Sequence, residues 1–267
     1  MNDARNIWKD VEAIRARSPL VHNITNYVVM NLTANALLAL GASPVMAHAM
    51  DEVEDMAGIA DALVLNIGTL SRPWIEAMEK AAAAAARKGI PIVLDPVGAG
   101  ATGFRTKTAL RLIAQSPPSI VRGNASEIRA LALSEKETKG VDSRHTADDA
   151  LDAALALARR TGGAVSVSGP VDIILDGQEL IRVSNGHPLM PRVTGLGCVA
   201  SALTGAFAAV NRSPLEAAAH AMAVMGIAGQ MAGAEARGPA SFETLFLDAL
   251  YNLDDKDIGR LLKLERA

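Results

Sequence analysis

The sequence predicts an α/β fold in which a mostly parallel central sheet has helices on both faces and an antiparallel hairpin at one edge. Short apolar runs alternate with helical patterns along most of the chain, as in strand–helix–strand units. Such units place parallel strands side by side through right-handed crossovers. The pair Asp176-Gly177 separates two further apolar runs, and this spacing is typical of a hairpin.

The elements follow in order along the chain. A charged amphipathic helix opens it, and the expected strands are the apolar runs at 20–24, 43–47, 62–67, 91–95, 119–123 and 164–168. One helix begins at Ser71 with Pro73 in its first turn and ends at Lys88-Gly89. From Cys198 to the C-terminus we expect almost only helices, interrupted at Pro214 and Gly238-Pro239. We find no linker or internal repeat, so residues 1–267 are expected to form a single domain.

Composition argues against several functional classes. The 267 residues carry a net charge of −3 with scattered Lys and Arg, which does not favour nucleic acid or an acidic membrane surface as a partner. The single cysteine cannot form an intrachain disulfide, and the N-terminus lacks the apolar core of a signal peptide. A cytoplasmic protein is therefore expected.

The stretch from Leu20 to Met50 contains no charged residue, although four asparagines and the Gly41…Pro44 break interrupt it. Those polar groups would lack partners in hydrocarbon, so we expect burial in protein rather than in a membrane. Contact between subunits and burial within one subunit both remain open.

A glycine turn precedes the last helical region. In Thr194-Gly195-Leu196-Gly197-Cys198, the glycines allow backbone N–H groups to turn inward at the positive end of the next helix. The pattern predicts an anion site, with a tight structural turn as the alternative.

Other strand ends carry polar groups. Asp95 precedes a glycine-rich loop without a Walker lysine, and Arg122 precedes Asn124 and Glu127. The carboxylates could hold a hydrated magnesium ion, although Asn124 and Glu127 also fit a helix capping box. Ser168 ends another strand. Because ligands gather at the carboxyl ends of parallel strands, this set favours phosphoryl transfer to a small molecule.

These segments resemble those of one family. HNITN at 22–26, GASPVMA at 41–47, LNIGTL at 65–70, DPVGAGAT at 95–102, RGNASEI at 122–128, NGHPL at 185–189 and VTGLGC at 193–198 are similar to hydroxyethylthiazole kinase. The resemblance implies a ribokinase-like three-layer sandwich and a homotrimer with active sites at subunit interfaces. It also implies transfer of the γ-phosphate of ATP to the alcohol of 4-methyl-5-(2-hydroxyethyl)thiazole in thiamine salvage.

The resemblance assigns roles to individual positions, which we group by ligand. They are Met46, Gly195 and Asn26 for the thiazole, Arg122, Ser168 and Gly197 for ATP, Asp95 and Glu127 for Mg²⁺, and Cys198 for catalysis. In the related enzymes an aspartate base occupies the position of this cysteine, so Cys198 is expected to face the substrate alcohol. We expect the helix N-terminus to lower the pKa of its thiol and nearby phosphates to oppose that shift.

Other interpretations remain. Cys198 could be a small buried residue or the nucleophile of a hydrolase paired with one of five histidines, none of which has a recognisable local signature. A kinase of another small alcohol, such as hydroxymethylpyrimidine, and a non-catalytic sensor of ATP or thiazole also remain possible.

Overall fold

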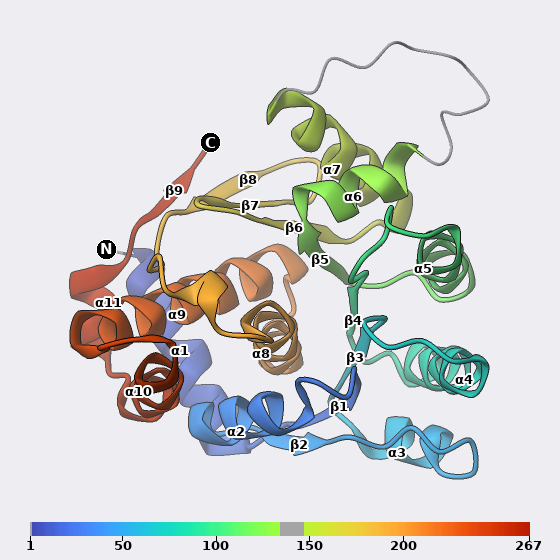
Figure 1. Cartoon of the computed structure of the whole chain (residues 1–267), viewed down its shortest axis with the longest axis horizontal. Helices are drawn as coiled ribbons and strands as arrows, with labels where there is room; N and C mark the ends of the chain where they lie inside the picture. The colour runs from blue at the N-terminus through green and yellow to red at the C-terminus, as the bar shows by residue number, and fades with distance from the viewer. Residues whose placement is uncertain (1, 134–146) are drawn as a thin grey trace.

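The computed structural model describes residues 2–133 and 147–267, which form one nine-stranded sheet in the order β2-β1-β3-β4-β5-β6-β7-β8-β9 (Figure 1). The strands are β1 (Leu20–Ile24), β2 (Ser43–Val45), β3 (Ala62–Asn66), β4 (Ile92–Asp95), β5 (Ile120–Asn124), β6 (Ala164–Ser168), β7 (Asp172–Leu175), β8 (Leu180–Val183) and β9 (Leu264–Arg266). Strands β1 to β6 pair in parallel, whereas β7, β8 and β9 are antiparallel. The mostly parallel sheet and its antiparallel edge hairpin are confirmed.

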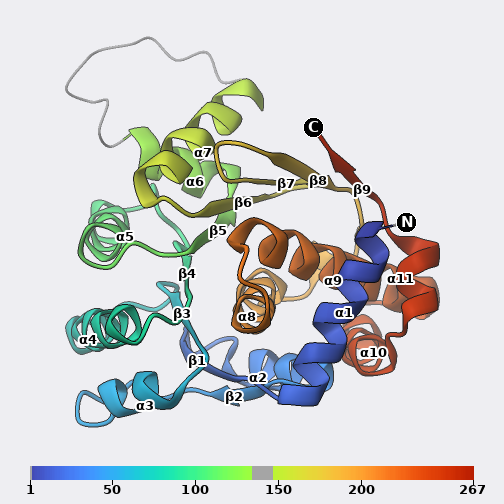
Figure 2. The same ribbon diagram turned by 180° about the vertical axis from the view of Figure 1, so that it is seen from behind.

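Helices cover both faces of this sheet (Figures 1 and 2). One layer contains α3 (Val53–Ile59), α4 (Arg72–Lys88), α5 (Gly103–Gln115), α6 (Ala125–Leu133) and α7 (Ala147–Thr161). The other contains α1 (Asn2–Arg17), α2 (Met30–Leu40), α8 (Leu196–Val210), α9 (Pro214–Glu235), α10 (Pro239–Asn252) and α11 (Asp255–Leu261). A separate apolar core lies on each face of the sheet, so the three-layer arrangement is also confirmed.

Helix α4 has the ends that its sequence predicts. The Ser71 hydroxyl accepts a hydrogen bond from the backbone N–H of Trp74, and Pro73 lies in the first turn. Gly89 ends the helix in the left-handed conformation, with φ of 77°, which costs glycine little because it has no Cβ.

The C-terminal region differs from the expectation in two places. Helix α8 begins at Leu196, before Cys198, and the chain ends in strand β9 rather than in a helix. Strand β9 pairs with β8, and the Arg266 guanidinium contacts both Asp3 and Glu216. Three residues are too few for a period-two pattern to indicate a strand, so these long-range contacts decide the conformation.

Polar residues gather where the parallel strands end. Asn66 of β3 is in register with Asp95 of β4, and Asn124 of β5 is in register with Ser168 of β6. Asn26 follows the end of β1. The sheet therefore brings these side chains to one edge, where an α/β fold places its ligands.

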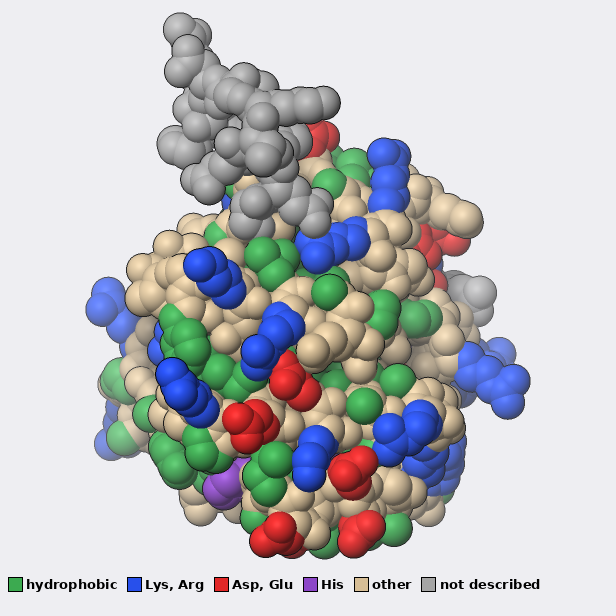
Figure 3. Space-filling view, turned by 90° about the vertical axis from the view of Figure 1, so that its right-hand side faces the viewer, with side chains coloured by type: hydrophobic (Ala, Val, Ile, Leu, Met, Phe, Trp, Pro, Cys, Tyr) green, Lys and Arg blue, Asp and Glu red, His purple; other side chains and the backbone are tan. Residues whose placement is uncertain are grey.

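The helical layer that contains α3, α4 and α5 exposes side chains of both charges. On the face that contains α3, α4 and α5, Lys and Arg side chains are interspersed with Asp and Glu (Figure 3). No helix among the described residues is both long and apolar enough to span a bilayer.

Candidate functional site

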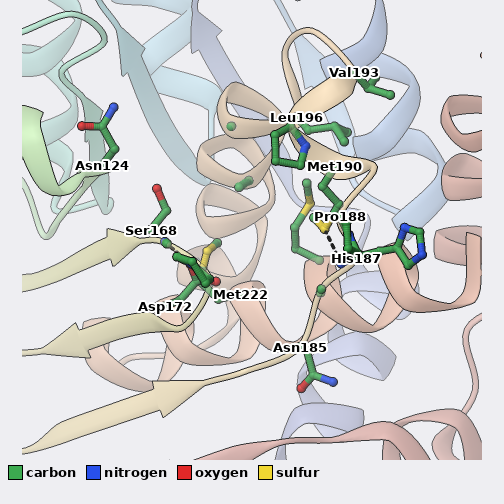
Figure 4. Close-up of a pocket in the computed structure, with 18 of the residues that line it drawn as sticks. Asn124, Ser168, Asp172, Asn185, His187, Pro188, Met190, Val193, Leu196 and Met222 are labelled. Atoms are coloured by element: carbon green, nitrogen blue, oxygen red, sulfur yellow. Dashed lines mark hydrogen bonds between the residues drawn. The ribbon is translucent and has the colours of Figure 1, made fainter. Parts of the chain in front are cut away.

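A cavity of about 740 Å³ opens beside the ends of β5 and β6. Its other walls are the loop from Ser184 to Gly197 and part of α9. Figure 4 shows Ser168 and Asp172 on the side of β6 and β7, with Met222 next to Asp172, and Met190 and Leu196 on the opposite side. The size of the cavity and its mixed polar and apolar lining are typical of a small-molecule site.

The glycine turn forms the end of this cavity nearest to α8. Gly195 has φ of 90° and precedes the helix, whose first backbone hydrogen bond runs from Val199 N to Gly195 O at 2.9 Å. A Cβ at Gly195 would lie 2.6 Å from Val29 Cγ1, so a larger residue would have to displace the start of α2. The N–H groups at the start of α8 lack helical acceptors, which makes this end suitable for an anion.

Arg122 lies beside the turn and lines the cavity. Its side chain is only 9% exposed, and Nη1 donates a hydrogen bond to the Gly197 carbonyl at 2.8 Å. Its Nε is buried and has no hydrogen-bond partner among the described residues. A buried guanidinium with an unused N–H group is a suitable donor for a phosphate or carboxylate.

Glu127 forms the capping box that its spacing predicts. Its backbone N–H donates to Asn124 Oδ1 at 3.0 Å, and its Oε2 accepts from the Asn124 N–H at 2.8 Å. The second carboxylate oxygen, Oε1, accepts the N–H of Gly98 at 2.8 Å. Glu127 thus connects the glycine-rich loop after β4 to the start of α6, and both of its oxygens already have protein donors.

Asp95 is buried at the end of β4, with 1% of its surface exposed. Its Oδ2 accepts hydrogen bonds from Asn66 Nδ2 at 2.7 Å and from the Ser201 hydroxyl at 2.8 Å. Burial raises the pKa of this carboxyl to about 6, while the charge of Arg122 and the Ser201 hydrogen bond oppose the rise. The carboxylate is therefore the main form at neutral pH.

Cys198 lies in the first turn of α8, and its sulfur accepts a hydrogen bond from Asn26 Nδ2 at 3.4 Å. Burial, followed by the negative charge of Asp95, raises the pKa of the thiol to about 11. Desolvation of the thiolate therefore outweighs the lowering by the helix end that we expected from the sequence.

The hydrolase interpretation needs a histidine at this sulfur. Among the described residues, the side chain that hydrogen-bonds to Cys198 is Asn26 and not a histidine. His145, one of the candidate histidines, lies outside the described residues.

The predicted site residues fall into three groups. Arg122, Ser168, Gly195 and Gly197 line the cavity together. Asn26, Asp95 and Cys198 do not line it, but they belong to one hydrogen-bonded cluster next to it. Glu127 lies between Gly98 and Asn124, as described above.

Met46 stands apart from these groups. It is half-buried just after β2 and does not line the cavity. The following residue, Ala47, is held through its carbonyl by His22 Nε2 at 2.7 Å. His22 is fully buried, and burial lowers its pKa, so the neutral ring holds the segment that contains Met46.

Two members of the cluster were missed in the sequence. Asn66 is the second residue of the segment LNIGTL and ends β3 next to the Asp95 strand, and Ser201 lies one helical turn after Cys198. The strand-end rule that selected Asp95 applies equally to Asn66, and the spacing of three residues puts Ser201 on the face of Cys198.

Comparisons with known proteins identify the family of this chain. The model of the hydroxyethylthiazole kinase family matches residues 11–256. A hydroxyethylthiazole kinase from Syntrophus aciditrophicus is 60% identical over 260 residues, which cover 97% of this chain and 96% of the relative. One from Nitratidesulfovibrio vulgaris is 54% identical over the full length of both chains.

Solved structures lead to the same family. The hydroxyethylthiazole kinase protein of Pyrococcus horikoshii superposes with a TM-score of 0.91 at 46% identity, covering 98% of this chain and 99% of that one. A pyridoxal kinase from Staphylococcus aureus superposes with a TM-score of 0.64 at 18% identity, covering 93% of this chain and 97% of that one. This similarity shows only that the two proteins share the ribokinase-like fold. The chain belongs to the hydroxyethylthiazole kinase family.

Proposed function

We propose that this protein transfers the γ-phosphoryl group of ATP to the alcohol of 4-methyl-5-(2-hydroxyethyl)thiazole, in thiamine biosynthesis or salvage. The observation that carries the proposal is a buried arginine with an unused Nε beside a glycine turn, at the polar end of a cavity of about 740 Å³. Family membership supplies the acceptor, since the relatives are named for this thiazole alcohol.

ATP fits the cavity with its phosphates at the polar end. Arg122, Ser168 and the N–H groups at Gly197 would bind the phosphates, and the apolar wall containing Met190 would receive the base. Fixed donors at the start of α8 can stabilise the charge of the transferring group without reorganisation. This pairing of an anion site with an apolar wall supports a nucleotide rather than a simple anion.

The thiazole alcohol would lie on the side of the turn that carries Cys198. Asn26, Gly195 and Met46 would form its site, with Cys198 against the hydroxyl. Because the pKa of the thiol is raised to about 11, Cys198 enters the reaction as a neutral thiol. It would therefore orient the hydroxyl, while the proton leaves late in a loose transition state and passes to a phosphate oxygen or to water.

Asp95 and Glu127 would hold Mg²⁺ through its water shell. Both oxygens of Glu127 accept backbone N–H groups, and Asp95 Oδ2 accepts two hydrogen bonds. Among the described residues, no group of three His, Cys, Asp or Glu side chains is arranged to hold a metal. These features fit a hydrated ion bound mainly by substrate phosphates. Such an ion would neutralise phosphate charge when bound.

We further propose that the protein is a cytoplasmic homotrimer of single-domain subunits, with active sites at the subunit interfaces. The charge-poor segment leaves Tyr27, Val28 and Leu38 exposed by 64%, 70% and 58% in one chain, which supports a subunit contact there. One sheet joining both ends of the described chain supports a single domain. A fully active monomer in sedimentation experiments would contradict the shared site.

The reaction is tested by measuring ADP formed from MgATP with the hydroxyethylthiazole, with hydroxymethylpyrimidine, and without acceptor. We expect ADP that depends on the thiazole. ADP with the pyrimidine alone would change the acceptor, and binding of ATP without ADP from either alcohol would favour a sensor.

Acceptor binding can be followed without turnover. The Trp74 ring lies 4.8 Å from Tyr27 and 4.6 Å from His48, and Tyr27 adjoins Asn26. In a Trp8→Phe background, thiazole should change the fluorescence of Trp74. A signal that does not saturate with thiazole would oppose a site at this position.

A further inference from the structure

We propose that Asn66 and Ser201 are positioning residues that join the acidic and alcohol sides of the site into one closed ring of side chains. The inference rests on the proposed function and extends it to two residues without an assigned role. The ring runs from Cys198 through Asn26, Asn66 and Asp95 to Ser201, and helix α8 closes it.

Asn66 is the centre of this ring. Its side chain is 1% exposed at the end of β3, between the ends of β1 and β4. Its Nδ2 donates to Asp95 at 2.7 Å, and its Oδ1 accepts from Asn26 Nδ2 at 3.0 Å and from the Gly68 N–H at 2.9 Å. The amide therefore connects the two sides of the site directly.

The direction of these hydrogen bonds follows from the backbone. A backbone N–H can only donate, so Asn66 turns its Oδ1 toward the Gly68 N–H and toward Asn26, and its Nδ2 faces Asp95. Asn26 must then turn its own Nδ2 toward Asn66, while its Oδ1 accepts the Val28 N–H at 3.1 Å. Each amide is thus fixed by a side chain and by a backbone N–H.

This order determines what Cys198 presents to the acceptor. The same Asn26 Nδ2 donates to the sulfur at 3.4 Å, so the thiol hydrogen must point away from Asn26. With the thiol neutral, its hydrogen and remaining lone pair are available to an alcohol. Asn66 thereby orients the thiol without touching the substrate.

Gly68 gives independent evidence that the two amides are enclosed. A Cβ on this residue would lie 2.7 Å from Asn26 Nδ2 and 2.9 Å from Asn66 Oδ1. Contacts this short are not tolerated, so an alanine would separate the amides. The backbone at Gly68 can therefore approach the two side chains only while Asn26 and Asn66 stay hydrogen-bonded to each other and the residue has no Cβ.

Ser201 holds the other end of the ring. It is fully buried on the face of α8 that carries Cys198, and its hydroxyl donates to Asp95. Because Cys198 and Ser201 belong to one helix, a shift of α8 would move both ends together. The distance between the acidic side and the thiol is thereby held constant.

The test uses Asn66→Leu, which keeps the size of the side chain but can neither donate to Asp95 nor accept from Asn26. We expect kcat/KM for the thiazole to fall by about 10²-fold, the cost of a small misplacement, with the KM for MgATP close to that of the parent. Gly68→Ala should give the same acceptor-specific loss. Its matched control is Gly58→Ala, where an added Cβ meets nothing within 4 Å.

A second readout does not depend on turnover. Cys198 is the only cysteine of the chain, so alkylation followed by mass spectrometry reports on it alone. Loss of the Asn66 amide, whose hydrogen bonding lowers the pKa of this thiol, should slow alkylation by about tenfold, equivalent to one pKa unit. Gly58→Ala should alkylate at the parent rate.

The outcomes separate the two proposals. If the parent protein forms no thiazole-dependent ADP, the proposed function fails, and alkylation still decides the inference. If Asn66→Leu and Gly68→Ala fold but leave thiazole kinetics and alkylation unchanged, the ring has no positioning role. Equal losses for thiazole and MgATP would also overturn it, because they indicate general damage.

Discussion

Two buried serines provide a sharp test of the hydrogen bonds around Asp95. Ser201 and Ser166 are both fully buried, but of these two serines only Ser201 donates a hydrogen bond to Asp95. The Ser166 hydroxyl has no partner among the described residues. Replacing each by alanine removes the same atom, so the difference between the variants isolates the hydrogen bond to a charged group.

The magnitude follows from this difference. A hydrogen bond to a charged group contributes about 1.5–3 kcal/mol, whereas removal of an unpaired buried hydroxyl is close to neutral. We therefore expect Ser201→Ala to unfold about 4–8 °C below Ser166→Ala at pH 8, from about 2 kcal/mol in a chain of this size. The gap should narrow near pH 4, where Asp95, with a pKa of about 6, is protonated.

The assay is calorimetric unfolding of both variants at one protomer concentration, since oligomers unfold in a concentration-dependent way. Equal melting temperatures at pH 8 would refute the reasoning. So would a gap that stays constant from pH 8 to pH 4, because the carboxylate charge would then have no part in it.

Three further expectations follow. Cys198→Asp should stay active or improve in steady-state assays, whereas Cys198→Ala should keep thiazole binding in calorimetry and lose rate by about 10²-fold, the cost of a misplaced hydroxyl. Arg122→Met should raise the KM for MgATP by about tenfold or more, because it removes a buried guanidinium worth at least one charged hydrogen bond. Stability should fall below about pH 6.5 because burial lowers the pKa of His22, and the unfolded chain then binds more protons. Burial also acts on His220, but Asp10 and Glu216 raise its pKa overall, so its contribution is present below about pH 6.5 and is lost as pH rises through the raised pKa.

Each of these has a contrary result. A folded but inactive Cys198→Asp would oppose the idea that the thiol takes the position of an aspartate base. An unchanged KM for MgATP in Arg122→Met would place ATP elsewhere. His22→Gln should reduce the loss of stability at acidic pH, and His220→Gln should reduce the loss of stability as the pH rises. Unchanged profiles of stability against pH would show that these histidines do not control it.

The fold could be predicted well where one local pattern decides the structure. The run LVHNI forms β1 from Leu20 to Ile24, and AVSVS forms β6 from Ala164 to Ser168. Both are buried apolar runs between clear breaks. Strand β9 could not be predicted, because its three residues depend on pairing with β8 and on the contacts of Arg266.

The site was predictable in position but not in its internal contacts. Asp95 and Arg122 follow strands, and parallel strands end together, so their convergence could be inferred from sequence. The pKa of Cys198 could not, because burial and the charge of Asp95 act through space. Of the two partners of Asp95, Asn66 could have been found by the same strand-end rule, whereas Ser201 is distant in sequence and meets Asp95 only in the folded chain.

The central claim is transfer of phosphate to the thiazole alcohol. The most direct measurement incubates the protein with ATP labelled in the γ-phosphate, Mg²⁺ and the hydroxyethylthiazole, and follows the label by chromatography and mass spectrometry. The account expects the label in a phosphate ester of the thiazole, in equal amount to the ADP formed. Label found only in inorganic phosphate, or left in ATP by a folded protein that binds both ligands, would contradict it.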